Sequence, residues 1–239
     1  MSAFIKFFHV TLWQPLFNLL VLFYLLIPNL GVAIILLTLL IRVILYPLQN
    51  KAAKSQIALQ KIQPKLKEIQ AKYKDNKEEQ AKQLMALYKR EKINPFSGFL
   101  VMLIQFPVLI VLYRLFWQGI QPESFQYLYS FVQQPETINS MFLGINMNEP
   151  SAILAILVGI AFFIQAKLSA PKKQKKAKDT KGMFGEMFQK QMMYVFPVFI
   201  VFILLRLPSA LGLYLLISGV FTAYQQYLAK KKYEENKAD

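Results

Sequence analysis

The stretch "LLTLLIRVILYPLQNKAAKSQ" (Leu36–Gln56) decides how the rest of the sequence is interpreted. Its first half continues an apolar run that begins at Leu30, and its second half changes into a lysine-rich segment. The apolar run is long enough to cross a bilayer as a helix, which takes about 20 residues. Arg42 nevertheless lies inside the run, about 10 Å from Gln49 at a helical rise of 1.5 Å per residue. An arginine at that depth needs a physical explanation.

The composition predicts an all-α, polytopic membrane protein. Of the 239 residues 55% are hydrophobic, 20 are Phe, and the mean hydropathy is +0.34. Soluble domains of this length are usually less apolar, and several runs here are longer than a core helix requires. The charged residues are concentrated between those runs, as expected for loops that connect membrane spans.

Charge and residue types narrow the classes of function. A net charge of +15 is compatible with nucleic-acid binding, but the distribution of Lys and Arg fits membrane orientation, so no DNA partner is expected. The chain has no Cys, and its single His is His9. Disulfides and thiolate chemistry are thereby excluded, and no His cluster can hold a metal. We therefore expect no enzyme activity, no cofactor and no metal site.

Five runs predict transmembrane helices of about 17–25 residues. They cover residues 30–48, 96–119, 151–168, 190–207 and 210–228. A further apolar segment, 10–27, is interrupted by Gln14, Pro15 and Asn18, so it is either an interfacial amphipathic helix or a sixth span. The predicted organisation is an N-terminal segment (1–28), a five-span core (29–228) and a basic tail (229–239).

The segments between these runs predict the orientation. Segment 49–95 has 12 Lys and Arg residues, segment 169–190 has 7 and the tail has 4. Segment 120–150 has none and carries three glutamates. Basic loops stay on the cytoplasmic side, so the first two segments and the tail are expected there, with 120–150 external. This predicts a multi-pass membrane protein with its basic segments in the cytoplasm.

The cytoplasmic segment 50–94 is predicted to be an antiparallel helical hairpin. Apolar residues recur at helical spacing on both sides of the polar "KDNK" (Lys74–Lys77), which is typical of a turn. Pro64 is expected to start or kink the first arm, because proline removes a helical hydrogen bond. The lysine-rich stretch 171–182 has no apolar period and is predicted to be disordered.

Two explanations of Arg42 remain open at this point. A long basic side chain can extend to the headgroups and keep its charge in water. Alternatively, Arg42 faces a water-filled recess, because no Asp or Glu occurs inside the five predicted spans to pair with it. Arg114 and Arg206 lie near the external ends of their spans, where the first explanation suffices.

Other polar residues fall at a comparable depth and suggest a polar pocket in the inner half of the membrane. Each of them alone is more often a helix–helix hydrogen bond. Together with Arg42 they are the candidate lining: Thr38, Gln105, Gln165, Ser218, Gln225 and Gln226.

An ordered set of motifs resembles the YidC family of membrane protein insertases. The motifs are "QPLFNLL" (14–20), "GVAIILLTLLIRVILYPL" (31–48), "LQKIQPKLKEIQAKYKDNKEEQAKQLMALYKREKINPFSG" (59–98), "LIQFPVLIVLY" (103–113) and "FPVFIVFILLRLPSALGLYLLISGVFTAYQQ" (196–226). The resemblance implies a five-helix core with a hydrophilic groove that opens to the cytoplasm and lipid and is sealed externally. It also implies groove roles for Arg42 and Thr38, substrate contact by Tyr214, and an interfacial helix at 10–27.

The resemblance further implies the partners and the class of member. Nascent membrane proteins and the lipid bilayer are the expected partners, with the ribosome and the Sec translocon as further candidates. Anionic lipid explains the basic tail as well as ribosomal RNA does. The chain lacks the lipoprotein Cys and large periplasmic domain of many bacterial members, so we expect a short bacterial-type member. The resemblance implies that it lies in the bacterial plasma (inner) membrane.

Three other classes of protein are alternatives to an insertase. A channel or transporter would need a continuous polar path, yet the outer halves of the spans are almost wholly apolar. An intramembrane enzyme would need catalytic groups that the composition lacks. A passive assembly scaffold differs from an insertase only in not requiring Arg42 and a wet pocket.

Overall fold

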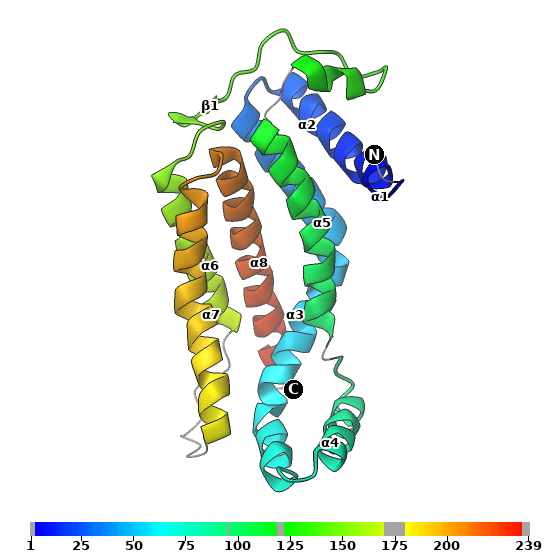
Figure 1. The fold of residues 1–239 in the computed structure, drawn as a ribbon, viewed down its shortest axis with the longest axis vertical. Coiled ribbons are helices and arrows are strands. Elements are labelled where there is room, and N and C mark those ends of the chain that lie inside the picture. The colour runs from blue at the N-terminus through cyan, green and yellow to red at the C-terminus, as the bar shows by residue number, and fades with distance from the viewer. Residues whose placement is uncertain (1–2, 95, 119–121, 170–179, 236–239) are drawn as a thin grey trace.

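The computed structural model describes residues 3–94, 96–118, 122–169 and 180–235, and most of them are helical (Figure 1). The longer helices are α2 (Gln14–Leu26), α3 (Leu30–Lys72), α4 (Lys77–Arg90), α5 (Ser97–Gln118), α6 (Ala152–Ser169), α7 (Thr180–Leu204) and α8 (Ser209–Glu235). The prediction of an all-α fold is confirmed, with one very short strand pair added. We call the end where α3 and α4 project the hairpin end, and the opposite end the loop end (Figure 1).

Helix α3 is a single helix of 43 residues that contains both Pro47 and Pro64. Of the two expectations for Pro64, that it starts the first arm of the hairpin is wrong, whereas a kink at Pro64 stays a prediction. A proline inside a helix removes one main-chain hydrogen bond, and α3 continues past this loss at both prolines. The helix begins at Asn29, whose side chain accepts a hydrogen bond from the Val32 N–H at 3.2 Å and so satisfies one free donor of the first turn.

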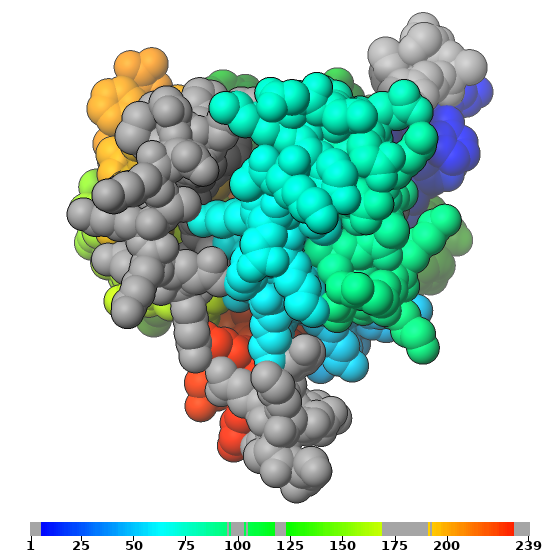
Figure 2. All heavy atoms as spheres, turned by 90° about the horizontal axis from the view of Figure 1, so that it is seen from below, coloured from blue at the N-terminus to red at the C-terminus, as the bar shows by residue number. Residues whose placement is uncertain are grey.

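The hairpin of α3 and α4 has its own small apolar core. Helix α3 ends at Lys72, and α4 begins after Asn76, whose side chain caps it by accepting from the Glu79 N–H at 3.0 Å. Buried Ile62 and Leu87 bring the two arms together, with buried Ile93 from the segment after α4. Seen from below, the hairpin occupies much of this end of the molecule (Figure 2).

The N-terminal segment consists of α1 (Ala3–Phe8), a π-helical turn (His9–Trp13) and α2. In the π turn the Gln14 N–H bonds to the His9 carbonyl, five residues back, just before Pro15, which has no N–H to donate. This segment lies across the loop end, inclined to α3 and α5 (Figure 1). Buried Asn18 attaches it to the long loop: its side chain donates to the Tyr127 carbonyl at 3.0 Å and accepts from the Tyr129 N–H at 2.7 Å.

The loop between α5 and α6 carries the strand pair, β1 (Met141–Phe142) and β2 (Ile145–Asn146), which are antiparallel. The turn between them has positive φ at Leu143 and Gly144. The Phe142 ring packs so closely on Gly31, in the first turn of α3, that a Cβ there would lie 2.2 Å from the ring. Gly31 is therefore required for this close approach.

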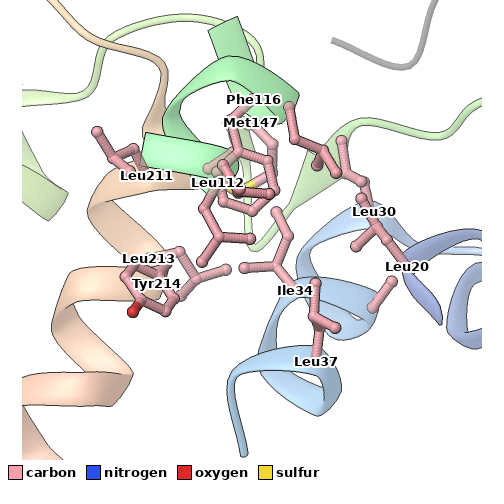
Figure 3. Close-up of a cluster of buried hydrophobic side chains, with 14 of the residues drawn as sticks. Leu20, Leu30, Ile34, Leu37, Leu112, Phe116, Met147, Leu211, Leu213 and Tyr214 are labelled. Atoms are coloured by element: carbon pink, nitrogen blue, oxygen red, sulfur yellow. The ribbon is translucent and has the colours of Figure 1, made fainter. Parts of the chain in front are cut away.

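The main apolar core lies toward the loop end, where α2, α3, α5 and α8 converge (Figure 3). It is built from the first turns of α3, the last turns of α5 and the first turns of α8, with Met147 from the loop. The side chains labelled in Figure 3 include Leu20, Ile34, Leu112 and Tyr214, each at most 1% exposed. This packing closes the bundle at the loop end.

Some helix boundaries differ from the sequence-based prediction. Helix α7 begins at Thr180, inside the stretch predicted to be disordered, whose residues 171–179 lie outside the described part of the chain. Helix α8 continues to Glu235, so most of the predicted tail is helical. Hydropathy alone marks the apolar part of such helices and misses their polar extensions.

Two helical stretches are long and apolar enough to cross a membrane by length and composition, Lys6–Leu26 and Leu30–Lys72. Three shorter apolar helical stretches lie in α5, α6 and α7.

Candidate functional site

A cavity of about 670 Å³ lies among α3, α5, α6, α7 and α8, on the hairpin side of the main core. Its lining is apolar except for one arginine and a set of uncharged polar side chains. The polar lining residues are Arg42, Gln49, Gln56, Gln105, Gln165, Ser218, Thr222, Gln225 and Gln226. Arg42, Gln105, Gln165, Ser218, Gln225 and Gln226 are sequence-predicted site residues that the fold brings to this one cavity.

Arg42 is the charged residue of this lining and is only 7% exposed. Its Nη1 donates to the Thr222 Oγ1 at 3.4 Å, and its Nε finds no hydrogen-bond partner among the described residues. Within the described residues, no carboxylate lies within ion-pairing distance of it. A buried guanidinium without a counter-charge is costly unless water or a ligand solvates it, so the cavity needs a polar occupant.

Thr222 connects Arg42 to α8. Its hydroxyl donates to the Ser218 carbonyl at 2.9 Å, one turn earlier, which leaves the oxygen available to accept from Arg42. Sequence reasoning missed Thr222, although its spacing of four from Ser218 places both on one helix face. Gln49 was also missed, because a glutamine at the end of an apolar run is common and gives no distinct signal.

The boundary between the cavity and the main core is a contact between Gln105 on α5 and Tyr214 on α8. The Gln105 amide Nε2 donates to the Tyr214 hydroxyl. Tyr214 is 1% exposed and its ring belongs to the core, so it does not line the cavity. Tyr214 thus orients Gln105, which does line the cavity, and substrate contact by Tyr214 itself stays a prediction.

Thr38 likewise does not line the cavity. It is 1% exposed, and its hydroxyl donates to the Ile34 carbonyl at 2.6 Å within its own helix. At the other end of the cavity, the Gln225 amide donates to the Tyr46 carbonyl at 3.3 Å, which joins α8 to α3 just before Pro47. Two contacts, from Thr222 and Gln225, thus hold α8 against the same two turns of α3.

In the part of the chain that the structure describes, three polar atoms of the lining are buried without a hydrogen-bond partner: Arg42 Nε, Gln49 Oε1 and Ser218 Oγ. They comprise one donor, one acceptor and one hydroxyl that can do both. Buried groups of this kind are usually satisfied by water or ligand. Among the described residues no group of three or more His, Asp or Glu side chains could hold a metal.

Comparison with known proteins identifies the family. A family model described as 60Kd inner membrane protein matches residues 22–237. The chain belongs to this family. The resemblance to the YidC family is also confirmed, because the relatives of this chain include membrane protein insertases of that name.

Two relatives and one solved structure illustrate the similarity. The membrane protein insertase YidC of Francisella philomiragia subsp. philomiragia is 34% identical over 210 residues, 87% of this chain and 34% of that protein. The YidC of Francisella tularensis subsp. novicida is 33% identical over the same shares. A crystal structure of an active YidC insertase, with its first transmembrane domain resolved, superimposes with a TM-score of 0.55 at 25% identity, covering 95% of this chain and 46% of that one. This member of the 60Kd inner membrane protein family thus spans about a third of the length of the curated relatives.

Proposed function

We propose that this chain inserts hydrophobic segments of nascent membrane proteins into the bilayer through the cavity that contains Arg42. The observation that carries the proposal is a buried arginine that pairs with no carboxylate of the described residues, in a cavity that the apolar core closes toward the loop end. A cavity that is closed toward the loop end favours an insertase over a channel, because a channel needs a polar path through the whole bundle. The similarity to YidC insertases supports the same function.

In the proposed topology α3, α5, α6, α7 and α8 span the membrane, and α1 and α2 lie at its external surface. The basic hairpin is then cytoplasmic, and the loop from 122 to 150 is external, as the charge distribution favours. The cavity opens toward the cytoplasmic half in this orientation. Nascent chains would enter there, with the ribosome and the Sec translocon as candidate partners of the basic surfaces.

The proposed mechanism lowers two barriers to insertion. A substrate with a polar N-terminal tail must lose water from the tail and move it across hydrocarbon. A polar cavity part-way through the bilayer shortens the dehydrated path, and Arg42 attracts an acidic tail transiently. The hydrophobic segment then partitions into lipid, which stabilises it by roughly 25 cal/mol per Å² of apolar surface buried. The membrane potential adds about 2.3 kcal/mol per 100 mV for each acidic charge that moves outward.

The test is insertion of a single-span substrate with an acidic tail into proteoliposomes that contain this protein. We expect Arg42→Ala to lower the rate about tenfold and Arg42→Lys to retain part of it, since lysine keeps the charge but loses the fork of donors. Arg114→Ala is the matched control, because Arg114 is exposed and lies outside the cavity. Normal insertion by Arg42→Ala would refute the role of Arg42.

The accessibility of the cavity is tested separately. The chain has no cysteine, so a single one at Ser218 can be labelled without background. We expect a small maleimide to react from the hairpin side and a cysteine at Thr38 to stay protected, since Thr38 does not line the cavity. Equal protection of both positions would show that the cavity is dry.

A further inference from the structure

The cavity is unusually rich in glutamine. Six glutamines line it, and they come from four helices: Gln49, Gln56, Gln105, Gln165, Gln225 and Gln226. Charge in the lining comes from Arg42 alone within the described chain. If the cavity selected only acidic tails, one would expect further cations, whereas the polar surface here is mostly neutral amide.

A glutamine side chain carries the same groups as a peptide bond, one C=O acceptor and an N–H donor. An unfolded tail that leaves water exposes one N–H and one C=O for nearly every residue, and each costs free energy unless it is hydrogen-bonded. Amide side chains can replace water for these groups whatever the side chains of the tail are. A lining of glutamines is therefore suited to main-chain recognition without sequence preference.

The hydrogen bonds inside the cavity indicate which partner is missing. In Gln105 and Gln225 the amide N–H groups are engaged, with the Tyr214 hydroxyl and the Tyr46 carbonyl. Among the described residues, none donates to the side-chain carbonyl oxygen of Gln49, which is buried in a residue only 7% exposed. The Ser218 hydroxyl, in a residue 2% exposed, is also without a partner. The unsatisfied capacity includes two acceptor oxygens, which match the N–H groups of a main chain.

We infer that the cavity binds the main-chain N–H groups of an extended, unpaired polypeptide tail through Gln49 and Ser218, and that Arg42 adds a preference for acidic tails. The inference rests on the proposed insertase function and names the class of substrate it accepts. Neutral tails are therefore also substrates. The cavity therefore discriminates against a tail whose main chain lacks N–H groups, and it still accepts a tail that lacks carboxylates.

The experiment uses synthetic single-span substrates that share one hydrophobic segment and differ in the tail. One tail contains glycine and serine, and the other replaces each glycine with sarcosine, whose methylated nitrogen has no N–H. Insertion is measured into proteoliposomes that contain the full chain. The rate for each substrate is divided by its rate of insertion into protein-free vesicles, which corrects for the difference in polarity between the two tails. We expect the glycine tail to be accelerated on the order of fivefold more than the sarcosine tail, the effect of about one hydrogen bond.

Variants assign this difference to the cavity. Gln49→Leu and Ser218→Ala should each reduce the ratio between the two tails, mainly by slowing the glycine tail. Ser218→Ala removes a single oxygen and is expected to fold normally. Gln70→Leu is the control for Gln49→Leu: Gln70 also lies on α3, and its exposed side chain is outside the cavity. It should leave the ratio unchanged.

Two results would overturn the inference in distinguishable ways. Equal acceleration of both tails, with an acidic tail still dependent on Arg42, would refute main-chain recognition and leave the insertase function intact. No acceleration of any tail by the parent protein would refute the insertase function and this inference with it.

Discussion

The attachment of α2 to the loop between α5 and α6 depends on Asn18, which gives a sharp prediction for Asn18→Leu. Asn18 is 1% exposed, and its side chain bonds to the Tyr127 carbonyl and the Tyr129 N–H at 3.0 and 2.7 Å. Leucine has the same number of side-chain heavy atoms, branched at the same carbon, and cannot form any of these bonds. The Tyr129 N–H then loses its partner, while the Tyr127 carbonyl keeps a bond from Gln14 at 3.0 Å.

The magnitude follows from this difference. Losing the bond to the partly buried Tyr129 N–H costs about 1–3 kcal/mol. Losing the bond to the Tyr127 carbonyl adds less than about 1 kcal/mol, because that carbonyl still accepts from Gln14. A total of about 2 kcal/mol in local opening corresponds to roughly 30-fold faster amide exchange. Hydrogen exchange read by mass spectrometry on peptides covering residues 125–132, in detergent or nanodiscs, measures it.

Gln14→Leu is the matched control, since it removes only the bond from the Gln14 side chain to the Tyr127 carbonyl and leaves the three bonds of the Asn18 side chain. We expect it to change exchange less than threefold. Unchanged exchange in Asn18→Leu would mean that the loop is held by its apolar contacts alone and that the assigned hydrogen bonds do not stabilise it.

Three further predictions concern other parts of the chain. Gly31→Ala should lower the melting temperature in detergent, because its Cβ would lie 2.2 Å from the Phe142 ring and force a shift costing about 1–3 kcal/mol; the additional change Phe142→Ala should remove the clash. In the hairpin, the hydrogen bond from Lys65 outweighs desolvation and holds the pKa of Glu91 below its usual 4.5. The ionised Glu91 therefore stabilises the folded hairpin at pH values above its unfolded-state pKa, and this contribution is lost as pH falls through its folded-state pKa. Proteolysis of the hairpin should then increase below about pH 4.5 in the parent protein and depend less on pH in Glu91→Gln. Thr222→Val should lower insertion of acidic tails and leave neutral tails unchanged, because it removes the acceptor that positions the cavity arginine.

The part of the site that sequence could predict consists of polar residues deep inside apolar runs. Arg42, Gln105 and Ser218 are conspicuous there because a polar group in hydrocarbon is expensive, and all three reach the cavity. Thr38 lies at the same depth and on the same helix, yet it satisfies its hydroxyl against its own helix. Depth can be read from sequence, whereas the direction in which a short hydroxyl side chain bonds depends on the neighbouring helices.

The parts that sequence could not predict lie where local signals are weak or contradictory. Gln49 and Thr222 sit near the ends of apolar runs, where polar residues are ordinary. Pro64 is a strong local signal for a helix break, yet α3 is continuous through it, and the buried Ile62 two residues earlier packs in the hairpin core. The overall fold was predictable because periodicity and charge distribution both extend over many residues.

The continuity of α3 has a mechanical consequence. At 1.5 Å per residue its 43 residues form a rod about 65 Å long, with one end in the main core and the other in the hairpin. A sideways load on the hairpin acts on that rod as on a lever arm, and the weakest point for bending is where proline removes a hydrogen bond. Pro47 lies between Arg42 and Gln49, so bending there changes the spacing between the cation and the free acceptor of the cavity. Whatever docks on the hairpin can therefore adjust the cavity through leverage, without entering it.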